Sequence, residues 1–171
     1  YDQRIFPVSC CGKLYRKDLL MQTEYIDYNG FWGEDRILNL AIYNQKPKTA
    51  INHKAIYNYQ WGGESVNSFK EGVLNDYVSV FETKRIWAKQ NGYDRYIPLM
   101  EQELKNLLFY YVRHMIDSEN YTKDEIITFL GYELANTPWR EWKDLPTPEK
   151  LYSKCYNSIS RILKRKLRSY L

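Results

Sequence analysis

This chain of 171 residues has only three cysteines and no long apolar run. Cys10, Cys11 and Cys155 form neither a Cys-x-x-Cys pair nor a spacing suited to zinc, and an adjacent pair is a poor start for a disulfide framework. A reduced, cytoplasmic protein is the simplest interpretation. Because no signal-peptide pattern and no run of eighteen apolar residues is present, we expect no segment to span a membrane.

The sequence also lacks internal repeats and low-complexity tracts, which excludes a solenoid or a fibrous protein. Its apolar content of 44% and its length suit about one globular domain with a substantial core. Seventeen tyrosines and five tryptophans exceed what such a core needs. Two explanations stay open for them: rings that stack on sugars, or the codon usage of an A/T-rich genome.

Two neighbouring carboxylates, Glu34 and Asp35, follow Gly33 and open a segment with helical spacing that ends by Lys46-Pro47. A helix start presents unpaired N–H groups and the positive end of the helix dipole, which keep an acid ionised and aimed. Such a carboxylate suits a general base. The alternative is that both acids are ordinary residues of a first helical turn.

Further along, residues 51–61 alternate with period two and end at a Gly-Gly pair, which predicts a strand with one buried face. His53 falls on the inner face, where a hydrogen-bonded core histidine is the alternative to a metal ligand. Residues 12–21 suit a short strand or turn that runs into a short helix. Helices are predicted over 66–90 with a stop at Asn91-Gly92, over 98–116, and from the Thr122-x-x-Glu125 capping box to about 134. Lys84 lies on the apolar stripe of the first of these helices.

The last segment, 149–171, follows a Pro- and Trp-rich linker at 136–148 and carries seven Lys/Arg and one acid. Its charge of +6 exceeds the +4 of the whole chain. An apolar stripe runs beside cations in it: Leu151, Cys155, Ile159, Ile162, Leu163, Leu167 and Tyr170 beside Lys154, Arg161, Lys164, Arg165 and Arg168. Two interpretations stay open: a helix on an anionic membrane, or a helix docked on the protein's own core. Sequence-independent nucleic-acid binding is a third option, which is not expected.

The order of several short motifs resembles the catalytic domain of family 2 glycosyltransferases, which have the GT-A fold and build bacterial surface polysaccharides. Those motifs are Gly-Lys-Leu-Tyr-Arg at 12–16, Gly-Glu-Asp at 33–35, Tyr-Asn-Tyr at 57–59 and Glu-Ser-Val at 64–66. The resemblance covers about residues 8–70, the C-terminal half of that domain. It implies an inverting transfer from a nucleotide-sugar donor to a glycan or lipid-linked acceptor.

Carried over residue by residue, the resemblance makes Asp35 the catalytic base and Glu34 the group that orients the acceptor or the base. Lys13 is then a candidate for contact with the donor phosphates or the acceptor. The aromatic residues Trp32, Tyr57 and Tyr59 are substrate-binding candidates, and His53 is a candidate metal ligand.

The chain departs from the family at one important point. No Asp-x-Asp occurs in it, although the family uses that motif to hold Mg²⁺ or Mn²⁺ under the diphosphate. We therefore expect a partial domain that binds no metal and has little activity alone, with the metal belonging to the complete enzyme.

The expected fold class is α/β and helix-rich, with a short GT-A-like sheet at 1–66, a helical extension at 67–135, the linker at 136–148 and the basic helix at 149–171. The expected location is cytoplasmic, with peripheral attachment to the inner membrane face left open, as is homo-oligomerisation. The alternative function is a non-catalytic, α-rich interaction protein whose basic helix binds a membrane surface or an acidic partner.

Overall fold

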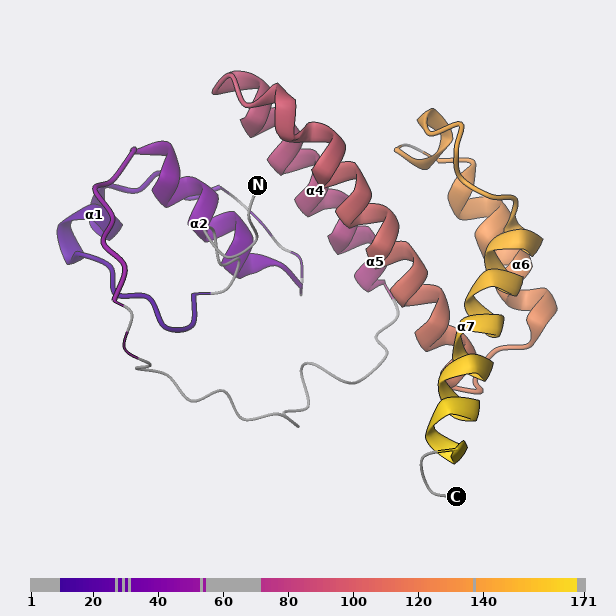
Figure 1. Ribbon diagram of the computed structural model, residues 1–171. Coiled ribbons are helices and arrows are strands. Elements are labelled where there is room, and N and C mark those ends of the chain that lie inside the picture. Colours follow the sequence, from indigo (N-terminus) through magenta and orange to yellow (C-terminus); the bar gives the residue numbers. More distant parts are fainter. Residues whose placement is uncertain are drawn as a thin grey trace. The chain divides into compact units, whose positions relative to one another are not determined.

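The computed structural model describes residues 10–26, 28, 30, 32–52, 54, 72–136 and 138–168, with side chains as far as residue 159. Every regular element in these ranges is a helix (Figure 1). They are α1 Lys17–Gln22, α2 Glu34–Asn44, α4 Val73–Gln90, η1 Asp94–Tyr96, α5 Ile97–Asp117, α6 Lys123–Leu134, η2 Trp139–Glu141 and α7 Pro148–Arg168. The chain divides into two compact units, Tyr1–Leu104 and Lys105–Leu171.

The predicted α/β fold with a short sheet is therefore wrong, and the described protein is all-α. Of the strand expected at 51–61, Ile51, Asn52 and Lys54 are described and have no strand geometry, while the other positions lie outside the described residues. Alternating polarity gives a strand only where another strand accepts its hydrogen bonds. The described ranges offer no such neighbour, whereas helices satisfy their backbone groups internally.

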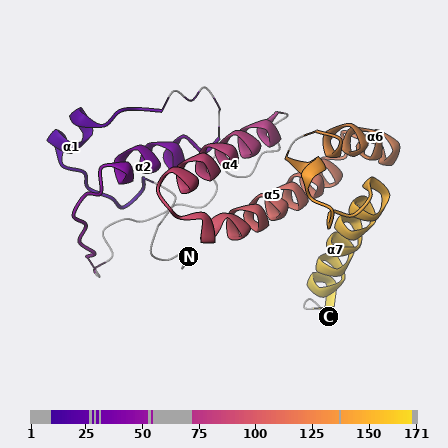
Figure 2. The ribbon, with the colours of Figure 1, turned by 90° about the horizontal axis from the view of Figure 1, so that it is seen from above.

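In the first unit, α2 packs against α4, and the beginning of α5 returns beside α4 (Figure 2). Apolar side chains of both helices form this core: Ile37, Ala41 and Ile42 from α2, with Leu74, Tyr77, Val80 and Phe81 from α4. The predicted stop of α4 is confirmed. Gly92 has φ +71°, and the N–H groups of Gly92 and Tyr93 bond back to Lys89 and Ala88, which closes the helix end.

In the second unit, α6 packs against α7. The predicted capping box is confirmed, because the Thr122 hydroxyl accepts from the N–H of Glu125 while the Glu125 carboxylate accepts from the N–H of Thr122. Within the predicted linker, Trp139 is fully buried and its indole N–H donates to Glu133 at 2.8 Å. This segment therefore contributes to the core of the second unit.

Candidate active site

Gly33 fixes the start of α2, where the acid pair was predicted to lie. Its φ of +96° is a left-handed conformation, and its carbonyl accepts from the N–H groups of Arg36 and Ile37. A Cβ at this position would lie 2.6 Å from Cγ2 of Val80, so the glycine also permits the close approach of α4. The prediction that Glu34 and Asp35 occupy the first turn of a helix is confirmed.

The two acids differ in their surroundings. Glu34 is exposed, whereas Asp35 is half-buried. The Cys10 thiol donates to the backbone carbonyl of Asp35 at 4.0 Å, and the negative charge of the Asp35 carboxylate acts on Cys10 and Lys13. Asp35 thus interacts with the segment that precedes α1, and Glu34 is the more exposed of the two acids.

Asn39, one turn further along α2, joins this segment to the acid-bearing turn. Its side chain is 4% exposed, and its Oδ1 accepts from Nζ of Lys13 at 2.7 Å and from the Tyr15 hydroxyl at 3.0 Å. Its Nδ2 donates to the carbonyl of Asp35 at 2.6 Å. Leaving such an amide buried without partners would cost about 1–3 kcal/mol, so these bonds hold the two segments together. We call Cys10, Lys13, Tyr15, Asp35 and Asn39 the Asn39 cluster.

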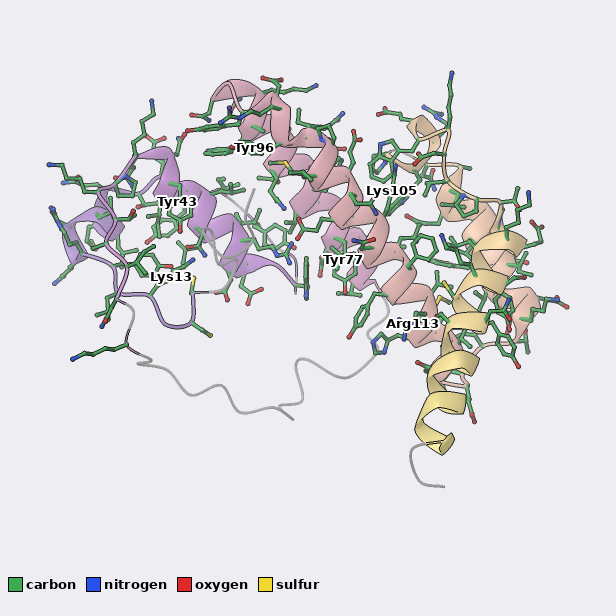
Figure 3. All side chains as sticks on the ribbon, in the orientation of Figure 1. Lys13, Tyr43, Tyr77, Tyr96, Lys105 and Arg113 are labelled. Atoms are coloured by element: carbon green, nitrogen blue, oxygen red, sulfur yellow. The ribbon has the colours of Figure 1, made fainter. Side chains whose placement is uncertain are left out.

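Burial sets the protonation behaviour of the Asn39 cluster. It raises the pKa of the Cys10 thiol and of the Tyr15 hydroxyl, so both stay neutral at physiological pH. Burial also lowers the pKa of Lys13, and the negative charge of Asp35 opposes that shift. Nζ of Lys13 lies 5.8 Å from the ring centroid of Tyr43, on the same side of α2 (Figure 3). Lys13 and Asp35 are therefore the cluster's opposite charges.

Trp32 lies two residues before Glu34, the first acid of the pair, and is held by α4. Its backbone N–H donates to Oδ2 of Asp76 at 3.0 Å, and its ring meets the ring of Tyr77 edge-on at 4.3 Å. The guanidinium of Arg36 lies 4.5 Å from the centroid of the Trp32 ring. The other substrate and metal candidates, Tyr57, Tyr59 and His53, lie outside the described residues.

Sequence reasoning missed an ion-paired group beside this site. Glu103 accepts from both Arg36 and Lys84, and the Lys84 side chain is 7% exposed. Burial would raise the pKa of Glu103, but the charges of Lys84 and Arg36 hold it below its ordinary value. The position of Lys84 on an apolar stripe was the signal, because a cation that faces a core needs an anionic partner.

In the Asn39 cluster a buried amide bonds the ammonium group of Lys13 and the backbone carbonyl of Asp35, whose side chain carries a carboxylate. An ammonium group and a carboxylate on one site suit proton transfer and the binding of a polar substrate. The part of the chain that the structure describes contains no group of three or more His, Cys, Asp or Glu residues placed to hold a metal. The candidate ligand His53 lies outside these residues, and no step below passes through a metal.

No protein-family model, curated protein or solved structure matches this chain. Among the described residues, no helix has both the length and the apolar character that crossing a membrane requires.

Proposed function

We propose that this chain carries the acceptor-activating part of an inverting glycosyltransferase, which moves a sugar from a nucleotide-sugar donor to a hydroxyl of a glycan or lipid-linked acceptor. One observation supports this most. The Gly-Lys-Leu-Tyr-Arg segment and the Gly-Glu-Asp turn, which are distant in sequence, meet at the Asn39 cluster. Lys13 and Tyr15 of the first motif thus bond the Asn39 amide, which in turn bonds the backbone carbonyl of Asp35 in the second.

In this proposal Asp35 is the general base. The acceptor oxygen attacks the anomeric carbon, its proton passes to the Asp35 carboxylate, and the bond from the anomeric carbon to the diphosphate oxygen breaks on the opposite face. The first turn of α2 favours the ionised carboxylate through the helix dipole. Glu34, exposed beside it, orients the acceptor, and Lys13 supplies positive charge to the donor phosphates or the acceptor.

A second candidate function comes from the helical character of the described residues. In a non-catalytic interaction protein, Glu34 and Asp35 would only stabilise the start of α2, and the Asn39 cluster would only fasten the segment before α1 to that helix. The absence of transfer with every donor tried would favour this candidate.

The test is Asp35→Asn in the full gene product, assayed with a panel of nucleotide sugars and glycan acceptors. Loss of a general base lowers turnover by about 10² to 10⁴, while donor binding stays nearly unchanged. Asp18→Asn is the matched control, because Asp18 is exposed and pairs only locally with Arg16. Turnover of Asp35→Asn equal to that of the control would refute the assignment.

A further inference from the structure

The length of α7 sets it apart within the second unit. At 1.5 Å per residue, its 21 residues extend about 31 Å, whereas the 12 residues of α6 extend about 18 Å. In both ribbon views the C-terminal half of α7 projects past α6 (Figures 1 and 2). The second unit therefore has a helical extension whose backbone reaches Arg168.

The first half of α7 is docked on its own unit. Leu151 and Cys155 are 0% and 1% exposed, and the Cys155 thiol donates to the carbonyl of Phe109. Nζ of Lys154 lies 4.6 Å from the centroid of the Phe109 ring. For these two turns, the interpretation of a helix packed on the protein's own core is correct.

The two edges of the apolar arc of α7 differ in burial. The edge with Leu151 and Cys155 is buried, whereas the tyrosine edge is partly exposed, with Nζ of Lys123 in α6 at 6.0 Å from the centroid of the Tyr152 ring. At 100° per residue, Leu151 and Cys155 lie at one edge of the arc, and Tyr152 and Tyr156 lie at the other. The two tyrosine rings stack on each other at 6.0 Å, and Tyr156 is 50% exposed. By the same rotation, Leu163 and Leu167 continue the tyrosine edge in sequence. Tyrosine, with an apolar ring and a hydroxyl that stays hydrated, is typical of membrane–water interfaces.

The positive charge of the last turns of α7 indicates what kind of surface the tyrosine edge binds. Residues 160–168 contain five cations and no acid: Arg161, Lys164, Arg165, Lys166 and Arg168. By the same rotation, four of them fall on the side of the helix opposite the apolar arc, and Lys166 falls within the arc. A helix with an apolar edge and dense positive charge is complementary to a surface that is both apolar and anionic.

We propose that the last turns of α7 bind the surface of an anionic lipid bilayer. The helix lies in the interface, with the edge that begins at Tyr152 and Tyr156 toward the acyl boundary and the cations toward acidic headgroups. Each cation near such a surface contributes about 1 kcal/mol, which is a factor of about five in binding. This inference does not depend on the glycosyltransferase proposal.

The experiment measures co-sedimentation of the full gene product with phosphatidylcholine vesicles and with vesicles in which a third of the lipid is phosphatidylglycerol. We expect binding to the anionic vesicles only, and release at about 1 M salt, where the Debye length is roughly 3 Å. No binding, or equal binding to both vesicle types, would overturn the proposal. Binding to an oligonucleotide without binding to vesicles would replace it with a nucleic-acid interface.

Two variants of equal charge change locate the surface. The α7 variant combines Arg161→Gln, Lys164→Gln, Arg165→Gln and Arg168→Gln. The control variant combines Lys48→Gln, Lys54→Gln, Lys89→Gln and Arg95→Gln, all at exposed cations of the first unit. We expect the α7 variant to lose on the order of a hundredfold or more in binding and the control to lose much less. Equal losses would show that net charge alone attracts the protein, and would refute the proposal.

An apolar variant, Leu163→Gln with Leu167→Gln, keeps the charge constant. Its binding to anionic vesicles should fall, because burial of apolar area adds to the electrostatic attraction. Unchanged binding would contradict the predicted placement of this edge in the bilayer. If a variant lost helical content, the lipid and salt comparison on the unmodified protein would still decide the matter.

Discussion

Glu103 gives the sharpest test of the packing in the first unit. Its carboxylate, 24% exposed, forms ion pairs with Arg36, which is 16% exposed, and with Lys84, which is 7% exposed. Replacing Glu103 with leucine removes the shared anion and leaves the Lys84 ammonium buried without compensation. Breaking a fully buried pair in this way costs 3–5 kcal/mol, and the partial exposure of Glu103 reduces the expected loss to about 2–4 kcal/mol.

The double variant Glu103→Leu with Lys84→Met distinguishes this explanation from a general packing defect. With Glu103 and Lys84 replaced by apolar groups of similar size, much of the lost stability should return, because the buried ammonium is gone and only Arg36, which also lies over the Trp32 ring, has lost its anion. The interaction free energy from the double-mutant cycle should therefore be large. Native-state hydrogen exchange of the α4 amides measures the local free energy of opening, and Glu101→Leu, on the same turn of α5, is the matched control.

The pH dependence gives a second measure of the same contact. The folded-state pKa of Glu103 is held below its ordinary 4.5. Its ion pairs therefore stabilise the fold fully above that pH, and this contribution is lost as the pH falls through the folded-state pKa. A Glu103→Gln variant should show a flatter loss of stability in acid. An equally steep loss, or a Glu103→Leu variant as stable as its control, would refute the reasoning.

Two further substitutions test local geometry. Gly33→Ala should destabilise the protein by about 2–4 kcal/mol, because it adds left-handed backbone strain to a clash with Val80. In a Val80→Ala background the same substitution should cost less, because only the clash is relieved and the backbone strain remains. Urea unfolding measures both effects, and a Gly33→Ala variant of unchanged stability would contradict the close approach of α2 and α4. Thr122→Ala should lower the stability by about 1 kcal/mol through loss of the capping box, whereas Thr122→Ser should be nearly neutral. If thermal unfolding gave the alanine and serine variants the same stability, the role of the cap would be refuted.

The sequence alone determined the features that depend on neighbours within one or two helical turns. The Thr122 and Glu125 capping box, the stop at Asn91-Gly92 and the acid pair in the first turn of α2 were all predicted correctly. Hydrogen bonds at helix ends join residues at most five positions apart, so sequence spacing is sufficient to identify them.

Only the tertiary structure decided which distant residues meet. Asn39 holds Lys13 beside the acid-bearing turn across 26 positions, and Glu103 pairs with Arg36 across 67, contacts that local spacing does not encode. The predicted sheet failed for the same reason, because a strand depends on a partner elsewhere in the chain. Spacing specified each helix and its apolar stripe, whereas the packing of those stripes determined which polar groups came together in the candidate site.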